Sequence, residues 1–481
     1  MAIDLAVSEA LDPWQYRVEP VGAGAGLRIR IGPGLPATRV FDATGVDVGV
    51  ILGFAIDLAD AVRLGEIYKF GSVAGVHAHE LADRIRDGLG GHFVLILDHA
   101  GVLRLYPDAV AQVPCVFDPD REIAGSTAHA ILDAAAYDAR FLQDSFEAME
   151  ILRDGWFPAG ATAHRGVERL LPNHYLDLKT WEAVRFWPME EIEKTEAPEE
   201  AAAEIVSIVR RQIEALVKSD RTVAQALTAG YETRWMLACA RPFVPDIGFV
   251  TVEPPNRTHI DADIAGRLAA AFGLNQRILP RVIATPEQQA RYLRRGGHCS
   301  GGQNRVTHPS MWVLAEGHCF VGGLNGEIAR GYTWRPEHRA EMDISPQMLM
   351  ARLGLPPSDN VEERFRRWRD GVPLRNALDI LDLNYLENRM GAWAYAQFCC
   401  DPSVPRYNPI GTPRTVKLML SLPEEWRRTY RLSQFAIENL WPELASIPIN
   451  TRGRLRDLLD KVGMAVANPE RVTRKLRKLS Q

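Results

Sequence analysis

Residues 223–240 constrain the fold of this chain more than any other stretch. They read as a short apolar strand (223–227), a tight turn of hydroxyl and glycine residues (228–233) and a helix that opens near Thr233. In such a unit the N–H groups of the turn and of the first helical turn converge on one point, where the helix dipole favours an anion. The pattern is typical of a phosphate site, although many parallel α/β units have it without a ligand.

The sequence around this unit alternates strands and helices. Apolar strands are expected at 249–252 and 319–321, and the spacing between the first two strands suits a parallel crossover. Thr258 is the expected N-cap of the next helix, which has Ile264 and Leu268 on one face and ends at Gly273. Beyond residue 345 the chain reads as mainly helical, with one long segment at 378–393 and a basic, solvated tail at 471–478.

The first 185 residues read instead as rich in strands. Two short strands, 92–98 and 102–106, flank a turn at 98–101, and 113–117 is another apolar segment. An acidic, alanine-rich stretch at 193–204 reads as a linker that runs into a helix. We therefore expect a first domain at 1–190 and a second at 195–481.

Composition argues against several classes of protein. The chain has 56 basic and 61 acidic residues and a formal net charge of -5, so no overall field favours nucleic acid. The apolar run at 48–56 is too short to span a membrane, and the first residues lack the basic start of a secretory signal. The six cysteines form no Cys-x-x-Cys pair, which indicates buried, reduced thiols and a cytoplasmic protein.

Several segments resemble the asparagine synthetase-like enzymes, and they occur in the family's order. The turn 227–234 (LTAGYETR) resembles the pyrophosphate loop Ser-Gly-Gly-x-Asp-Ser, and 249–252 with 261–265 resembles the family's second strand and helix. The stretch 320–332 (FVGGLNGEIARGY) resembles the second phosphate and metal loop. The match extends to the end of the family's glutaminase domain (155–158 and 165–176) and to its C-terminal helical signature (408–413 and 420–424).

This resemblance implies an α/β multi-domain protein. Its first half would be an α+β sandwich of the glutamine-hydrolase type, and its second half a parallel-sheet, pyrophosphate-loop synthetase domain with a helical C-terminal part. The family uses ATP and Mg²⁺ to adenylate a substrate carboxylate, releases pyrophosphate, and lets an amine attack the acyl-adenylate. The protein would thus be an ATP-dependent carbon–nitrogen ligase.

The same resemblance assigns roles to residues. The N–H groups of three loop residues and two hydroxyls would bind pyrophosphate, adenine would lie on backbone groups at a strand end, and two acids would bring carboxylates to Mg²⁺, which prefers oxygen ligands. The cofactor-binding set is Leu227, Thr228, Ala229, Gly230, Tyr231, Thr233, Thr251, Val252 and Gly323, and the metal set is Glu232 and Glu327.

Two departures from the family affect the first half and the metal site. Ala2 stands where glutamine-hydrolysing members have their nucleophilic cysteine, and the nearest cysteine in sequence is Cys115, so glutaminase activity should be absent. Both metal-binding aspartates of the family are glutamates here. Glu232 also fits an ordinary acid in the first turn of a helix, where it would interact with the dipole.

A third departure affects the catalytic residues. Leu324 stands where active members have a Tyr or Glu that helps to deprotonate the amine, and the family's C-terminal lysine has no counterpart beyond Arg452 and Arg454. Tyr332, His298 and His308 are the candidates for the base, and each also fits an ordinary polar residue of the fold. The Gly-rich polar segment 296–308 is predicted as a substrate loop.

Two functions remain open at this point. The first is an ATP- and Mg²⁺-dependent amide ligase that joins a carboxylate of a small molecule or peptide to an amine without glutamine hydrolysis. The second is a catalytically degenerate synthetase fold that acts as a binding or scaffold partner. Neither nucleic acid nor membrane is expected as a partner, and a homodimer is left open.

Overall fold

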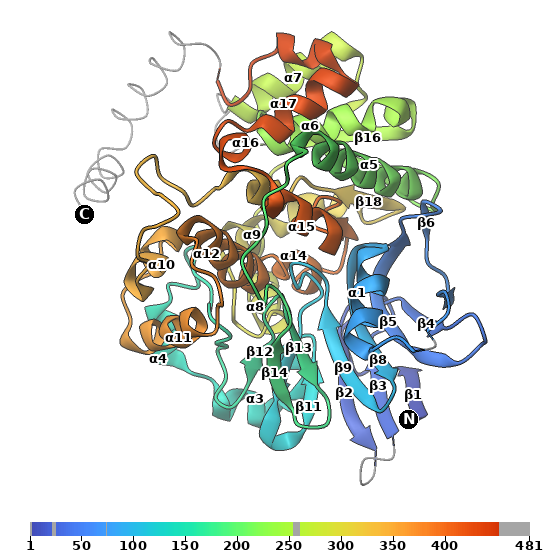
Figure 1. Cartoon of the computed structure of the whole chain (residues 1–481), viewed down its shortest axis with the longest axis vertical. Coiled ribbons are helices and arrows are strands. Elements are labelled where there is room, and N and C mark those ends of the chain that lie inside the picture. Colours follow the sequence, from blue (N-terminus) through green and yellow to red (C-terminus); the bar gives the residue numbers. More distant parts are fainter. Residues whose placement is uncertain (1, 22–25, 74, 254–259, 452–481) are drawn as a thin grey trace.

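Most strands of the chain lie in its first 185 residues, as the sequence pattern predicts. The computed structural model describes residues 2–21, 26–73, 75–253 and 260–451. Figure 1 shows the early strands in the lower part of the molecule, toward the right, and the later helices above and to the left of them. The chain is an α/β protein with mixed and parallel sheets.

The first sheet has mixed pairing. β1 pairs in parallel with β3, and the other ladders between its described strands are antiparallel. Its strand order is β1 (Ala2–Val7), β3 (Gly26–Ile31), β2 (Tyr16–Val21), β11 (Ile123–Gly125), β10 (Val116–Asp118) and β12 (Glu168–Arg169).

The second sheet contains the predicted hairpin around residues 98–101. Its strand order is β14 (Glu182–Arg185), β13 (His174–Asp177), β9 (Val102–Pro107), β8 (Leu89–His99), β5 (Asp47–Asp57), β4 (Ala37–Phe41) and β7 (Ile67–Lys69), with β6 (Val62–Arg63) paired to β5. β8 begins three residues before the predicted start. Gly91 makes this extension possible, because it has a φ of +115° and a Cβ there would lie 2.1 Å from the carbonyl oxygen of Phe54.

The two sheets pack face to face. Val18 and Ile29 of the first sheet share one core with Val50 and Val94 of the second. α1 (Ala78–Asp87) covers the outer face of the second sheet, and α2 (Ala128–Ile131) packs on the outer face of the first. α3 (Ala134–Arg140) and α4 (Gln143–Ala148) follow. The predicted sandwich is therefore present, while its likeness to a glutaminase stays a prediction.

The third sheet is parallel throughout its described ladders. Its order is β17 (Gln276–Leu279), β16 (Ile247–Val252), β15 (Thr222–Ala226), β18 (His318–Val321) and β19 (Arg406–Tyr407). The predicted crossover between the strands at 223–227 and 249–252 is confirmed. Ala224 and Val250 face η3 (His308–Leu314), while α5 (Pro198–Val217) and α6 (Tyr231–Ala240) lie on the opposite side.

The later helices follow the sequence pattern with one difference. The predicted helix with buried Ile264 and Leu268 is confirmed, and Gly273 follows its end with a φ of +62°. The predicted N-cap Thr258 and the tail 471–478 lie outside the described residues. The segment 378–393 is helical but contains a wider, π-helical stretch, η5 (Asn384–Met390), which the sequence pattern does not predict. The other helices are α7 (Ile260–Phe272), α8 (Pro286–Arg295), α9 (Gly302–Thr307), α10 (Pro346–Leu353), α11 (Asp359–Asp370), α12 (Ala377–Leu383), α13 (Gly391–Trp393), α14 (Ala396–Cys399), α15 (Pro413–Ser421), α16 (Glu424–Arg428) and α17 (Arg431–Leu440).

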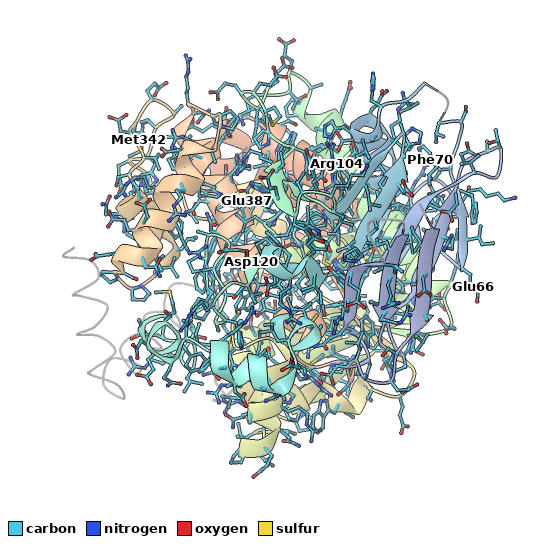
Figure 2. The ribbon with its side chains drawn as sticks, turned by 90° about the horizontal axis from the view of Figure 1, so that it is seen from below. Glu66, Phe70, Arg104, Asp120, Met342 and Glu387 are labelled. Atoms are coloured by element: carbon cyan, nitrogen blue, oxygen red, sulfur yellow. The ribbon has the colours of Figure 1, made fainter. Side chains whose placement is uncertain are left out.

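Buried polar contacts join the two halves of the chain. Arg185 of β14 binds Glu387 of η5 through both of its terminal nitrogens, at 2.7 and 2.8 Å. Figure 2 shows Glu387 near the middle of the view, between the strands of the first half and the helices of the second. The backbone N–H of Asn408 donates to Nε2 of His92 at 2.9 Å.

The structure also bears on the predictions about the cysteines and about membrane-spanning segments. All six cysteines are free and buried, as predicted. In the parts of the chain that are described, no helix has both the length and the apolar character needed to cross a bilayer.

Candidate functional site

The predicted phosphate turn lies between β15 and α6. The helix begins at Tyr231, two residues before the predicted start, because Gly230 takes the N-cap position with a φ of −74° and a ψ of 163°. Arg234 donates its N–H to the carbonyl of Gly230 at 3.2 Å, which is the first backbone bond of the helix. The N–H groups of Tyr231, Glu232 and Thr233 precede that bond, so they are the donors that a helix N-terminus presents to an anion.

The two predicted hydroxyls meet in front of this glycine. Oγ1 of Thr228 lies 2.7 Å from Oγ1 of Thr233, and the N–H of Gly230 donates to Thr228 Oγ1 at 3.2 Å. A Cβ on Gly230 would lie 3.4 Å from that hydroxyl and 3.6 Å from Oε2 of Glu232. The turn therefore brings hydroxyls and a carboxylate around the face of a residue that has no side chain.

One predicted donor already has an anionic partner. The N–H of Ala229 donates to Oδ1 of Asp261, in the first turn of α7, at 2.9 Å. The sequence predicts Asp261 in a helix of the second half but indicates no role for it at the turn. An acid in the first turn of the helix after the second strand was the available signal, since strand ends and helix starts meet at this edge of a parallel sheet.

The two predicted metal residues are close to each other. Oε1 of Glu232 accepts a hydrogen bond from Nε of Arg330 at 2.6 Å. Oε2 of Glu327 is buried and has no hydrogen-bond partner among the described residues. Burial, and then the charge of Glu232, raise the pKa of Glu327 to about 7. The guanidinium of Arg330 is thus bonded to Glu232 and acts on Glu327 only through its charge.

Two glycines allow the loop after β18 to pack against the start of α6. A Cβ on Gly323 would lie 3.1 Å from Cβ of Glu232, and one on Gly326 would lie 2.6 Å from its Cγ. Gly323, predicted to bind the cofactor, is therefore at the site, where it permits this close approach. Leu324 is partly buried and packs on the main core.

Aromatic side chains surround the same guanidinium. The ring centre of Tyr332 lies 4.9 Å from Cζ of Arg330, and that of Tyr430 lies 5.6 Å from it. Tyr430 also stacks on Tyr231 at 4.6 Å with an angle of 11° between the rings. Tyr332 is 55% exposed, so this candidate for the base lies at an open edge of the carboxylate pair.

The donor set of this site can be compared with the needs of Mg²⁺. Mg²⁺ usually takes one or two carboxylates and completes its shell with water and substrate phosphates. The described residues contain no group of three or more His, Cys, Asp or Glu that could hold a metal by themselves. The orphaned oxygen of Glu327 and the nearby Glu232 fit a cation that also binds phosphate.

The predicted adenine position lies at the end of β16. The hydroxyl of Thr251 donates to the carbonyl of Leu227 at 2.7 Å and accepts from Nε2 of Gln276 at 2.9 Å, so it is already engaged within the protein. Val252 is 38% exposed and lines a cavity of about 280 Å³ together with Asn304, Thr307 and His308. The structure thus brings the strand end and the predicted substrate loop together.

The remaining catalytic candidates differ in where they lie. Nδ1 of His298 lies 2.7 Å from the hydroxyl of Tyr137, and burial lowers the pKa of His298 to about 4, so this residue is a contact between the halves of the chain. Arg452 and Arg454 lie outside the described residues. The chain just before them reaches the turn, because the N–H of Asn450 donates to the carbonyl of Ala229 at 2.9 Å.

Comparison with known proteins assigns no family to the chain. No family model matches the chain, and no curated protein matches it. Among solved structures, it is similar to the U34-tRNA thiolase NcsA from Methanococcus maripaludis with its 4Fe-4S cluster, at 13% identity over 56% of this chain and 93% of that chain. The TM-score is 0.22, which is too low to indicate a shared fold.

Proposed function

We propose that the protein is an asparagine synthetase-like ligase that uses ATP and Mg²⁺ to join a substrate carboxylate to an amine, without glutamine hydrolysis. The observation that supports this most is the meeting of Glu232 and Glu327 beside the donor-rich turn 228–233. Two acids next to a phosphate would repel it unless a cation lay between them. A turn with both features therefore favours a metal–phosphate ligand over a bare anion.

Each part of the site has a role in this proposal. The first-turn N–H groups and the hydroxyls of Thr228 and Thr233 would bind the pyrophosphate portion of ATP. Glu232 and Glu327 would hold Mg²⁺, and ATP supplies the adenylyl group that activates a carboxylate. Arg330 would balance the negative charge of the departing pyrophosphate, since a fixed cation stabilises charge that develops during a reaction. The cavity at Val252 is large enough for part of the nucleoside or substrate.

The nitrogen would come from a free amine. No cysteine stands at the position of the glutaminase nucleophile, which is Ala2. Cys115 cannot replace it, because this thiol is buried and burial raises its pKa to about 12. A thiol that stays protonated is a poor nucleophile.

One alternative has specific support. Asp261 already accepts from the turn N–H of Ala229, and Arg330 already compensates Glu232. These contacts give the N–H of Ala229 and the carboxylate of Glu232 partners within the protein. Leu324, which stands at the family position of the residue that deprotonates the amine, cannot accept a proton. These features favour a degenerate fold that serves as a binding or scaffold partner.

The variant Gly230→Ala tests nucleotide binding at the turn without unfolding the protein. Alanine fits the backbone angles there and meets only ordinary contacts, so the cost to stability should stay below about 1 kcal/mol. Its methyl group would fill the space in front of the turn and should abolish stabilisation by ATP and Mg²⁺. Gly248→Ala, in β16 with its nearest contact at 3.7 Å, is the matched control and should respond like the wild type.

The measurement is thermal unfolding with ATP and Mg²⁺, followed by pyrophosphate exchange with candidate carboxylates. A ligand at about 100 times its Kd stabilises by about 2.7 kcal/mol, which such melts detect easily. An absence of any shift in the wild type and in the double variant Glu232→Asp, Glu327→Asp would refute nucleotide binding. A shift without exchange for any carboxylate would favour the scaffold.

A further inference from the structure

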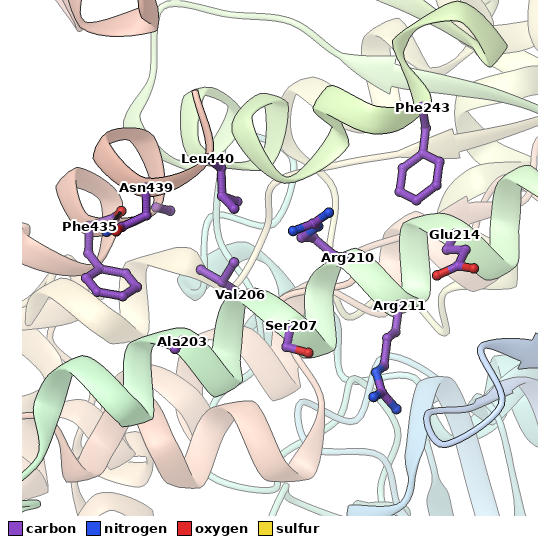
Figure 3. A pocket seen from close by; sticks show the side chains of 11 residues that line it. Ala203, Val206, Ser207, Arg210, Arg211, Glu214, Phe243, Phe435, Asn439 and Leu440 are labelled. Carbon is purple, nitrogen blue, oxygen red and sulfur yellow. Dashed lines mark hydrogen bonds between the residues drawn. The ribbon is translucent and has the colours of Figure 1, made fainter. Parts of the chain in front are cut away.

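A second cavity lies between α5 and α17, apart from the turn 228–233. Its volume is about 440 Å³, which is within the range of small-molecule sites. Figure 3 shows side chains of both helices facing each other across it, with Phe243 of η2 (Arg241–Asp246) at one end. Its apolar walls are Ala203, Val206, Phe243, Phe435, Ala436 and Leu440.

Two arginines line this cavity, and they differ in their contacts. Arg210 makes no hydrogen bond or ion pair with any residue in the described ranges, and Figure 3 shows it reaching from α5 to a position between Leu440 and Phe243. The donors of Arg211 are used elsewhere, because its Nη1 donates to the neutral carbonyls of Leu58 and Ala59 at 2.6 and 3.2 Å. Glu214 pairs with Lys218 at 2.6 Å.

We propose that this cavity binds a small molecule that carries one carboxylate on an apolar body, with Arg210 as the partner of the carboxylate. The planar donors of Arg210 match a carboxylate in two parallel hydrogen bonds. The apolar walls would cover the remainder of the ligand. The hydroxyl of Ser207 and the amide of Asn439 add polar groups at the rim.

The site is independent of the proposed ligase activity. No residue of the turn 228–233 lines the cavity. The two regions share α17, because Phe435 and Leu440 line the cavity while Tyr430, just before the helix, stacks on Tyr231 at the turn. A bound carboxylate would therefore contact the helix that begins at the candidate active site.

Calorimetric titration of the full chain with octanoate and with octanol tests the proposal. Octanoate should bind at least about tenfold more tightly than octanol, and Arg210→Met should reduce its affinity to that of octanol. Arg291→Met, at an exposed position of α8 outside the cavity, is the matched control and should leave the affinity unchanged. Ser207→Trp, at an exposed position, should block the cavity at little cost to folding.

Three results would overturn the proposal. They are equal affinities for octanoate and octanol, an unchanged affinity in Arg210→Met, or no saturable binding of octanoate or phenylbutyrate up to about 10 mM. A dimer that Ser207→Trp dissociates, without octanoate binding, would instead assign the cavity to a second copy of the chain. None of these outcomes depends on ATP, so they leave the proposed function to its own test.

Discussion

Nε of Arg330 donates to Oε1 of Glu232 at 2.6 Å, and this ion pair joins η4 (Gly326–Arg330) to the first turn of α6. The two side chains are only 18% and 16% exposed, so solvent screens their attraction little. The charge of Glu327 also acts on Arg330 and raises its pKa further, after that of Glu232. Arg330 is thus a positive charge that offsets both acids where they lie close together.

Arg330→Met should make the site more dependent on a divalent cation. Loss of the charged hydrogen bond should lower the free energy of unfolding by about 1.5–3 kcal/mol without metal. Mg²⁺ should then raise the Tm of the variant more than that of the wild type, because the acids are left uncompensated. Thermal melts with and without MgCl₂ at constant ionic strength measure this. Arg366→Met, which removes the solvent-exposed ion pairs with Glu362 and Glu363 on α11, should change stability by less than about 1 kcal/mol.

Gly331 holds the loop that carries Glu327 and Arg330. Its φ is +54°, and a Cβ there would lie 2.3 Å from the indole of Trp334, whose Nε1 donates to the carbonyl of Leu378 at 3.1 Å. Gly354 has a similar φ of +73° but no atom within 4 Å of such a Cβ. An alanine at either position is strained by about 1–2 kcal/mol in the left-handed conformation, and only Gly331→Ala also displaces the indole.

We expect Gly331→Ala to be less stable than Gly354→Ala by about a further 1–3 kcal/mol in urea denaturation. It should also lose any stabilisation by ATP and Mg²⁺, because the loop would move both charged side chains. Equal losses in the two variants would mean that Trp334 does not fix the loop.

Local patterns along the chain predicted the elements of the site, and long-range side-chain contacts completed it. The strand, turn and helix at 223–240 depend on neighbours in sequence, so periodicity and capping were sufficient for them. The Ala229–Asp261 and Glu232–Arg330 contacts join residues 32 and 98 positions apart. Such pairs depend on how β16, α7 and η4 meet, which no spacing in one sequence specifies.

The stretch 378–393 illustrates the same limit. Its apolar spacing predicts a helix, and a helix forms, but the π-helical turn of η5 accommodates buried polar residues. Glu387 and Asn388 are fully buried there, and each has a partner in the first half of the chain. The periodicity of one segment does not report partners more than 200 residues away.

His92 should make stability depend on pH. It is buried, its Nε2 accepts from the N–H of Asn408, and burial lowers its pKa to about 3. An unfolded histidine titrates near 6.5, so the unfolded chain binds this proton first as pH falls. The stabilisation is complete above about pH 6.5 and is lost as pH falls toward 3, by about 1.4 kcal/mol per pH unit.

The variant His92→Gln keeps an acceptor and removes the titration. As pH falls from about 6.5 to about 4, its free energy of unfolding should decrease less steeply than that of the wild type. The difference in slope should be that of one proton, about 1.4 kcal/mol per pH unit. Urea denaturation at several pH values gives both slopes. Identical slopes would show that His92 is protonated in the folded protein.

Glu387 should be the strongest single tie between the two halves. Its fully buried carboxylate accepts from Arg185 at 2.7 and 2.8 Å, from Nε1 of Trp368 at 2.7 Å and from Nδ2 of Asn173 at 2.9 Å. Glu387→Gln or Arg185→Met leaves a buried partner uncompensated and should cost about 3–5 kcal/mol. Arg364→Met breaks the more exposed pair with Glu168, which also joins the halves, and should cost less than about 1 kcal/mol.

A double-mutant cycle separates the attraction in this pair from the cost of burying its charges. Arg185→Met with Glu387→Leu should lose much less than the sum of the single variants, since neither charge is then left alone. Additive losses would mean that Trp368 and Asn173 satisfy Glu387 without the arginine. In that case the junction would depend on the hydrogen bonds to Glu387, and its stability would change little with salt.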